Sequence, residues 1–183
     1  MSQPGLYGPV SDLVWQKAQK IKLLICDVDG VFSDGRIYMG NDGEELKAFH
    51  TRDGYGVRSL LTSGFAVAVI TGRKSKIVEN RMTALGISEI YQGIDDKFVP
   101  FNALMKHYNV SADEVAYIGD DMVDLPVMKA VGLAVCVADG HPYVKQHAHM
   151  VTQINGGHGA LRELADLLLV SQDKFNTAHG MSI

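Results

Sequence analysis

The sequence predicts an α/β fold with a Rossmann-like, mainly parallel sheet that is flanked by helices. Short unbroken apolar runs, which are typical of strands buried on both faces, alternate with amphipathic segments of helical spacing. The chain has 183 residues, of which 46% are hydrophobic. This length predicts a single domain over residues 1–183 with a substantial core. The predicted core strands cover residues 22–27, 65–70, 115–118 and 133–137.

The first half of the chain begins with residues 1–8, whose Pro, Gly and Ser content predicts a loose segment. A short helix over 10–20, with Ser11 as its N-cap, precedes the first core strand. Two strand-like segments around an Asn-Asp-Gly turn then predict a β-hairpin. We expect this hairpin, over about 32–50, to form a flap near the end of the first strand. A helix over 53–63 leads to the second core strand.

The second half repeats this alternation. Ser75 is the expected N-cap of a helix that ends before Gly86, and Ser111 with Glu114 has the spacing of a capping box. A strand follows Glu114 directly, so only a turn is expected there. Pro126 lies near the start of a short helix. The remaining elements are a strand at 89–92, a helix at 97–108, a short strand at 150–151, a helix at 159–170 and an aperiodic tail at about 173–183.

Composition excludes several function classes. The net charge of −4 argues against a nucleic-acid binder. No apolar run reaches the ~18 residues of a membrane span, and Asp12 and Trp15 lie where a signal peptide needs an unbroken apolar segment. Cys26 and Cys136 lie in apolar runs, so we expect buried free thiols in a reducing compartment. These observations predict a cytoplasmic protein without nucleic-acid or membrane partners.

Asp27 and Asp29 are the first candidate functional residues. They end the first predicted strand in the sequence Asp-Val-Asp-Gly, with both side chains on the same side. Ligands of open α/β sheets bind beyond the carboxyl ends of the strands. Two carboxylates this close cannot both stay ionised without a cation or a shared proton, so they indicate a metal ion, acid–base chemistry or both. The alternative is a polar strand end that only opens a loop.

Four separate segments place reactive groups where strands end or the next helix starts. If the strands are parallel neighbours, these groups converge on one crevice. The set fits phosphoryl transfer, because a carboxylate can be a nucleophile, clustered aspartates suit Mg²⁺, and a hydroxyl and an ammonium can hold phosphoryl oxygens. Taken singly, each segment is also explained by a turn, a solvated helix start or a cap. The segments carry Asp27 and Asp29, Thr71, Lys97, and Asp120 with Asp121 and Asp124.

The order of these residues resembles the four motifs of the haloacid dehalogenase-like phosphatases. The matching stretches are Asp-Val-Asp-Gly at 27–30, Thr-Gly-Arg at 71–73, Lys97, and Gly-Asp-Asp-Met-Val-Asp at 119–124. Such a conjunction of motifs is far more specific than any one of them. The resemblance covers residues 22–137 and implies a phosphatase.

The resemblance also implies roles for these residues. Asp27 is the expected nucleophile, which becomes an aspartyl phosphate, and Asp29 protonates the leaving alkoxide and then deprotonates water. Thr71 and Lys97 are the other expected catalytic residues. Mg²⁺ is expected on the Asp27 side chain, the Asp29 carbonyl and Asp120. The residues expected to support the metal or Lys97 from behind are Asp121 and Asp124.

The spacing of the motifs leaves no room for a cap domain. The hairpin and one helix fill the interval from Asp27 to Thr71, and a single helix fills the interval from Lys97 to Asp120. A capless enzyme must exclude water in another way. We expect a neighbouring subunit to complete the site, because an isolated two-stranded hairpin is marginal in water. The aperiodic tail is a second candidate lid; the alternative is a loose chain end without a role.

Longer stretches resemble those family members that act on sugar-acid phosphates of lipopolysaccharide synthesis. They imply a homotetramer and the substrate 3-deoxy-D-manno-octulosonate 8-phosphate, which is hydrolysed to the free sugar acid and phosphate. Relatives act on nine-carbon sialic-acid-type phosphates, and that alternative stays open. The resembling stretches are residues 30–35, 49–54, 119–126 and 155–160.

The arginines agree with an acidic substrate. The chain has six, and four lie between the hairpin and the helix after Thr71. A fork-shaped guanidinium suits a carboxylate, whereas surface salt bridges are the alternative for at least one of them. His147 and His149 have no further ligand near in sequence and are not expected to bind metal. The candidate substrate-binding residues are Asp29, His50, Thr51, Arg52, Asp53, Gly54, Arg58, Gly72, Arg73, Arg81, Lys97 and Asp121.

Two other function classes use a similar set of residues. Response-regulator receiver domains place aspartates, a threonine and a lysine around Mg²⁺, but they are phosphoacceptor switches that do not turn over. Their acceptor aspartate lies on a middle strand, and receiver domains have no counterpart of Asp29 two residues after that acceptor. An inactive oligomeric binding module is the third class, and the intact pair of Asp27 and Asp29 argues against it.

Overall fold

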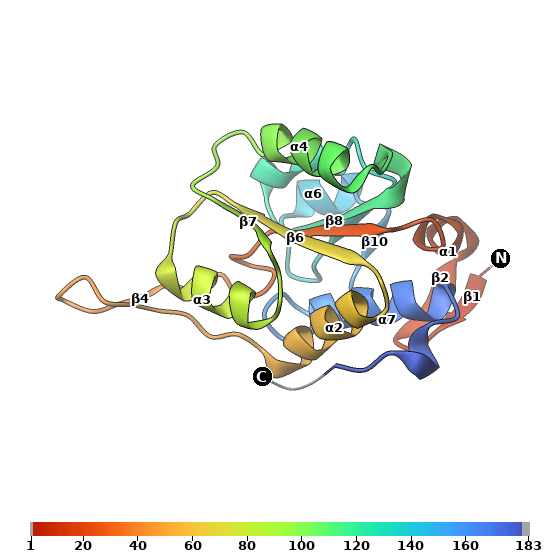
Figure 1. The fold of residues 1–183 in the computed structure, drawn as a ribbon, viewed down its shortest axis with the longest axis horizontal. Helices are drawn as coiled ribbons and strands as arrows, with labels where there is room; N and C mark the ends of the chain where they lie inside the picture. The colour runs from red at the N-terminus through yellow and green to blue at the C-terminus, as the bar shows by residue number, and fades with distance from the viewer. Residues whose placement is uncertain (1, 181–183) are drawn as a thin grey trace.

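The computed structural model describes residues 2–180, and its centre is a six-stranded sheet in which all pairings are parallel. The strand order is β10-β9-β8-β3-β6-β7 (Figure 1). The predicted mainly parallel sheet is confirmed. The strands are β3 (Leu23–Cys26), β6 (Ala66–Thr71), β7 (Glu89–Gln92), β8 (Val115–Gly119), β9 (Leu133–Cys136) and β10 (Met150–Val151).

Helices cover both faces of this sheet (Figure 1). One apolar cluster joins the sheet to α1, α2, α3 and α7, and a second joins it to α4, α5 and α6. β3 is buried on both faces, because Leu24 and Cys26 belong to the first cluster and Leu23 and Ile25 to the second. The helices are α1 (Asp12–Ala18), α2 (Thr51–Thr62), α3 (Lys76–Ala84), α4 (Phe98–Tyr108), α5 (Leu125–Met128), α6 (Pro142–His147) and α7 (Ala160–Ser171).

The predicted flap hairpin is present, with shorter strands than expected. β4 (Tyr38–Met39) pairs antiparallel with β5 (Glu45–Leu46), and Figure 1 shows the hairpin extending away from the body of the molecule. Three large apolar side chains on it are exposed, namely Tyr38, Met39 and Leu46. The flap therefore presents an apolar surface that its own chain does not cover.

The prediction of a loose N-terminal segment is wrong for the described residues. β1 (Ser2–Gly5) and β2 (Gly8–Ser11) form an antiparallel hairpin. The Tyr7 hydroxyl between them donates a 2.9 Å hydrogen bond to Asp166 on α7, which fixes the turn to the body. Ser11 then caps α1 by accepting a bond from the Val14 amide, as predicted.

Other local predictions have mixed outcomes. Ser111 and Glu114 do form both bonds of a capping box, which opens the 3₁₀ turn η1 (Ala112–Glu114). Ser75 precedes α3 but makes no side-chain cap bond. α6 was not predicted; His141 caps it and Pro142 is its first residue. Cys26 and Cys136 are buried free thiols, as predicted.

The tail returns to α2 of its own chain. After the 3₁₀ turn η3 (Phe175–Thr177), the Thr62 hydroxyl donates a 2.8 Å hydrogen bond to the His179 carbonyl, and Gly180 packs against Tyr55 and Ser59. The last three residues of the predicted lid, 181–183, lie outside the described residues. Within the described part, no helix has the length and apolar character needed to cross a membrane.

Candidate active site

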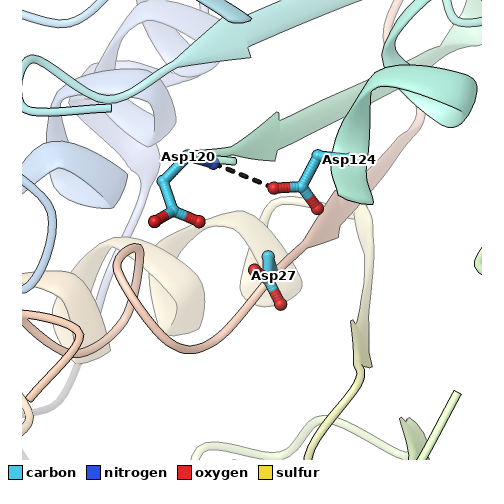
Figure 2. Close-up of side chains that lie close together, drawn as sticks. All are labelled: Asp27, Asp120 and Asp124. Atoms are coloured by element: carbon cyan, nitrogen blue, oxygen red, sulfur yellow. Dashed lines mark hydrogen bonds between the residues drawn. The ribbon is translucent and has the colours of Figure 1, made fainter. Parts of the chain in front are cut away.

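The carboxyl ends of three adjacent strands bring the candidate residues together. β3 lies between β6 and β8, and all three run parallel. Asp27 directly follows β3, and its amide bonds the Ile118 carbonyl at 3.0 Å, which ties it to β8. Asp120 and Asp124 come after β8, and Figure 2 shows their carboxylates turned toward that of Asp27. The predicted convergence at one edge of the sheet is therefore present.

Lys97 bridges two of these carboxylates. Its Nζ lies 2.9 Å from Asp27 Oδ1 and 2.7 Å from Asp124 Oδ1, and the side chain is almost fully buried. Burial alone would lower the pKa of Lys97, but the charges of Asp27 and Asp124 outweigh burial and raise the pKa. Lys97 is therefore held as a cation against the Asp27 carboxylate.

Asp124 has both of its oxygens engaged. Oδ1 accepts from Lys97 and, at 2.6 Å, from the Tyr117 hydroxyl. Oδ2 accepts from the backbone amides of Asp120 at 3.0 Å and of Asp121 at 3.1 Å, and the first of these bonds is drawn in Figure 2. With this set of partners, Asp124 is suited to orienting Lys97 and the loop after β8, as expected of a supporting residue.

The carboxylates of Asp27, Asp120 and Asp124 form the one group of at least three acidic, His or Cys residues with metal-binding spacing in the described chain. Their oxygens lie within 4.8 Å of one another. Burial, with the charge of Asp27 next in size, raises the pKa of Asp120 to about 8. Burial, with the charge of Asp124 next in size, raises the pKa of Asp27 to about 6 against the opposing effect of Lys97. A bound cation would relieve this repulsion, and the all-oxygen donor set suits Mg²⁺.

Asp27 and Asp120 are the members with oxygens left for a metal. Asp124 fits less well as a direct ligand, because protein donors already occupy both of its oxygens. Gly30 lets the Asp120 carboxylate approach the backbone that follows Asp29. The φ of Gly30 is +88°, and a β-carbon at residue 30 would overlap that carboxylate. The expected contribution of the Asp29 carbonyl stays a prediction.

Asp29 follows Asp27 by two residues and is half-buried, with two cations at its carboxylate. Oδ1 contacts Nζ of Lys47, and Oδ2 lies 3.9 Å from Nε of Arg73. Lys47 comes from the flap, directly after β5, whereas Arg73 follows β6. The flap therefore reaches the candidate acid–base residue, as its position in the sequence suggested.

The structure also locates the other candidates. Thr71 ends β6 and is buried, and Gly72 and Arg73 follow it at an exposed turn. Asp121 is exposed and accepts a bond from the Met122 amide.

At the start of α2, the His50 ring accepts from the Arg52 amide and Thr51 is the first helical residue. Arg81 on α3 lies against Gly54 of α2.

Two further candidate substrate ligands make contacts within their own chain, and their expected contact with substrate stays a prediction. The Asp53 carboxylate is buried at the N-terminus of α7, where Oδ1 accepts a 2.9 Å bond from the Arg162 amide. Asp53 therefore caps α7 of its own chain. Arg58 donates at 3.4 Å to the Leu85 carbonyl, beyond the C-terminal end of α3. This bond joins α2 to the end of α3.

Sequence reasoning missed Tyr117, Glu45 and Lys47. Tyr117 lies within an apolar strand, so its hydroxyl gave no signal apart from its position near the Asp120 segment. Glu45 and Lys47 stand at alternate positions of the flap, a pattern that two-residue periodicity predicts to share one face. Neither His147, the last residue of α6, nor His149 joins a metal group in the described chain: His147 contacts the Tyr143 carbonyl, and His149 accepts from the Ala134 amide.

Comparisons with known proteins agree with this geometry. Residues 74–164 match the model of the haloacid dehalogenase-like hydrolases. A 3-deoxy-D-manno-octulosonate 8-phosphate phosphatase of Yersinia pestis is 58% identical over 97% of this chain and 95% of its own. The crystal structure of a Yersinia pestis phosphatase of that name superposes with a TM-score of 0.98 at 56% identity, and it covers 100% of this chain and 99% of that chain.

A more distant structure carries ligands. The phosphatase of the same name from Moraxella catarrhalis, in complex with a magnesium ion, a phosphate ion and KDO, gives a TM-score of 0.87 at 41% identity and covers 90% of this chain and 94% of its own. The fold and the matched residues place the chain among the haloacid dehalogenase-like hydrolases. Within that class, the chain belongs to the family of 3-deoxy-D-manno-octulosonate 8-phosphate phosphatases.

Proposed function

We propose that this chain is a Mg²⁺-dependent phosphatase that hydrolyses 3-deoxy-D-manno-octulosonate 8-phosphate to the free sugar acid and phosphate. The proposal rests on the Asp27 carboxylate, which lies 2.9 Å from Lys97 Nζ and close to the Asp120 carboxylate at one edge of the sheet. The chain matches a relative named for this activity over 95% of that relative's length, which supports the choice of substrate. The enzyme is a single capless domain that acts in the cytoplasm, in lipopolysaccharide biosynthesis.

Asp27 and Asp120 would hold Mg²⁺ through their carboxylates, together with the backbone carbonyl of Asp29. When bound, Mg²⁺ supplies positive charge that offsets the negative charge of the phosphoryl group and of the aspartates. Asp124 and Asp121 support this site from behind. Asp124 does so by fixing Lys97, and its bonds to the amides of Asp120 and Asp121 hold the loop on which the metal ligand stands.

The chain's own residues carry the chemistry in two steps. Asp27 attacks the phosphorus, the bond from phosphorus to the sugar oxygen breaks, and Asp29 gives its proton to the departing oxygen. Water then attacks the aspartyl phosphate, Asp29 takes the proton from that water, and phosphate leaves with Asp27 restored. The Thr71 hydroxyl and the Lys97 ammonium hold phosphoryl oxygens as charge develops on them.

Arginines near the candidate active site recognise the sugar acid. Arg73 follows β6 at the site, and Arg52 and Arg81 lie at or against the start of α2. Guanidinium groups suit the substrate carboxylate. The residues from His50 to Gly54 reach the substrate of a neighbouring subunit.

A substrate panel tests this proposal. We expect kcat/KM for 3-deoxy-D-manno-octulosonate 8-phosphate to exceed that for neutral sugar phosphates and for nine-carbon sialic-acid-type phosphates. Equal values across the panel would defeat the assignment of the substrate but leave the phosphatase activity intact. Preference for the nine-carbon acid would select the alternative substrate. Mg²⁺-dependent phosphate release without steady turnover would instead indicate a phosphoacceptor switch, and no reaction would indicate a binding module.

We also propose that the active form is a homotetramer in which the flaps pack together. Tyr38 and Met39 on β4 and Leu46 on β5 are 51%, 74% and 60% exposed, and such an apolar surface favours burial against other copies. Sedimentation should detect a tetramer, and Met39→Ser with Leu46→Ser should yield smaller species with lower activity. Leu13→Ser, which alters an exposed leucine on α1, is the matched control. A fully active monomer at assay concentration would contradict the proposal.

A further inference from the structure

The side chain of Lys47 is buried, although the residue lies on the projecting flap and is partly exposed as a whole. Its side chain has 0% exposure, and its Nζ contacts Asp29 Oδ1 and lies 3.4 Å from Glu45 Oε1. Burying an ammonium costs free energy unless carboxylates pair with it, and lysines usually extend their charged ends to water. The position therefore reflects a specific interaction with the acidic residues.

Arg73 completes a four-residue ion network. Its Nε lies 3.9 Å from Asp29 Oδ2, and its terminal nitrogen lies 3.7 Å from Glu45 Oε2. Each oxygen of Asp29 thus faces a different cation, and Glu45 links both cations from the opposite side. Contacts at both oxygens oppose rotation of the Asp29 carboxylate about its χ2 bond, a torsion that is otherwise broad.

The flap supplies half of this network through its strand geometry. Glu45 and Lys47 are two residues apart, so their side chains share one face, whereas Leu46 between them is 60% exposed. Pairing of Met39 with Glu45 in the hairpin fixes where that face lies. The arrangement also explains why Lys47 carries its charge inward rather than to the solvent.

We infer that Lys47 is a positioning residue that acts through Asp29, with Glu45 holding it in place. The inference rests on the proposed acid–base role of Asp29. In the first step Asp29 gives up a proton while the bond from phosphorus to the leaving oxygen breaks, so negative charge develops on its carboxylate. The Lys47 ammonium keeps that carboxylate aimed at the leaving oxygen and stabilises the charge that appears on it. Lys47 neither gives nor takes a proton.

Leaving groups distinguish this role from a purely structural one. A benzyl alkoxide needs a proton as it departs, whereas p-nitrophenolate is stable without one. Both esters are small and lack the sugar acid, so contacts with the substrate carboxylate do not enter the comparison. Loss of Lys47 should therefore slow hydrolysis of benzyl phosphate selectively. Loss of the flap's structure should slow both esters alike.

The experiment compares wild type with Lys47→Met, Lys47→Arg and Glu45→Gln in the full-length protein with Mg²⁺. For Lys47→Met we expect kcat/KM to fall at least about tenfold for benzyl phosphate and for 3-deoxy-D-manno-octulosonate 8-phosphate, with less than about twofold loss for p-nitrophenyl phosphate. Lys47→Arg should restore most of the loss, because it keeps the cation. Glu45→Gln should show the same selectivity to a smaller extent. Lys74→Met removes an exposed lysine one residue after Arg73 and should change neither ester.

The outcomes separate this inference from the proposed function. Equal losses for both esters in Lys47→Met, or unchanged rates for both, would overturn the positioning role while wild-type turnover stands. Absence of Mg²⁺-dependent hydrolysis in the wild type would overturn the proposed function itself. Sedimentation of Lys47→Met reports whether the flap still supports the same assembly as in the wild type.

Discussion

The hydroxyl of Tyr117 donates a 2.6 Å hydrogen bond to Oδ1 of Asp124, and neither side chain is exposed to solvent. The same oxygen accepts from Lys97 at 2.7 Å, and Lys97 also lies 3.2 Å from the Tyr117 oxygen. Tyr117 therefore belongs to the support of the lysine that contacts Asp27. Burial, with the charges of Asp124 and Asp27 next in size, raises the pKa of Tyr117 well above its usual value, so the hydroxyl remains a donor.

Replacing Tyr117 with Phe should weaken both stability and activity. The change removes one buried bond to a charged acceptor, so the free energy of unfolding should fall by about 1–3 kcal/mol in urea titration. We expect kcat to fall several-fold, because Lys97 loses one of its fixed neighbours. Tyr91→Phe, whose hydroxyl bonds the partly exposed Glu89, is the matched control and should cost less. Equal costs in the two variants would contradict the supporting role.

Asp27→Asn and Asp29→Asn should each abolish useful turnover. The first change removes the nucleophile, and the second removes the group that protonates the leaving oxygen, an effect worth about 10²–10⁴-fold in rate. Phosphate release with 3-deoxy-D-manno-octulosonate 8-phosphate is the measurement, and circular dichroism checks that both variants fold. Turnover by either variant near the wild-type rate would remove the proposed mechanism.

Metal removal should abolish activity, and added Mg²⁺ should restore it. The structure adds a stability signature, because Asp27, Asp120 and Asp124 repel one another without a cation. In EDTA, Asp120→Asn should therefore melt above the wild type, by about 2–4 °C for each kcal/mol of relieved repulsion. In Mg²⁺ the order should reverse, since the variant loses a metal ligand. Identical melting temperatures in both conditions would argue against a metal at Asp120.

Asp53 should make stability depend on pH. Burial raises its pKa from 3.8 to about 6 in the folded protein, so the folded state holds the proton more tightly than the unfolded chain. Its contribution is complete below pH 3.8 and is lost as pH rises through 6, by an amount on the order of 3 kcal/mol. The difference in unfolding free energy between wild type and Asp53→Asn should therefore fall from pH 4 to pH 7 and then level off. The exposed Asp113→Asn is the matched control.

Deleting residues 177–183 tests the tail as a lid. The described part of the tail packs Phe175 and Ala178 against the core, and the Thr62 hydroxyl donates a bond to the His179 carbonyl. We expect kcat or KM to change several-fold while the melting temperature is nearly unaltered, because a lid must bind weakly enough to release product. Unchanged kinetics in the truncated enzyme would assign the tail no role. Thr62→Val tests whether docking on the chain's own α2 competes with lid closure.

The sheet and the strand ends could be predicted because burial on both faces leaves a distinct sequence pattern. β3 and β8 are continuous apolar runs, and each is followed at once by acidic residues. The carboxyl ends of parallel strands meet at one edge, so Asp27 and Asp120 could be placed together before any coordinates. Lys97 was expected there as one of four segments that place a reactive group at a strand end or a helix start, although its position says little by itself.

What could not be predicted depends on contacts between distant segments. The bonds that Asp53 makes with α7 and Arg58 makes with the end of α3 gave no signal in the sequence, because each bond joins segments that are far apart in the chain. The inward direction of Lys47 depends on how the flap returns to Asp29. Residues 2–11 carry a loop-like composition, and their pairing is stabilised by Tyr7 and Asp166, which are far apart in sequence.

The central position of β3 has a consequence for how the protein is made. Its apolar strand leaves the ribosome early, but its partners β6 and β8 are synthesised later, and β8 pairs Val115 with Leu23 across a long stretch of chain. Until Gly119 has emerged, one edge of an entirely apolar strand stays open, and such edges promote aggregation. The nascent chain should therefore need chaperone protection over this interval. A circular permutant that begins before β8 would shorten the exposure and should improve the soluble yield.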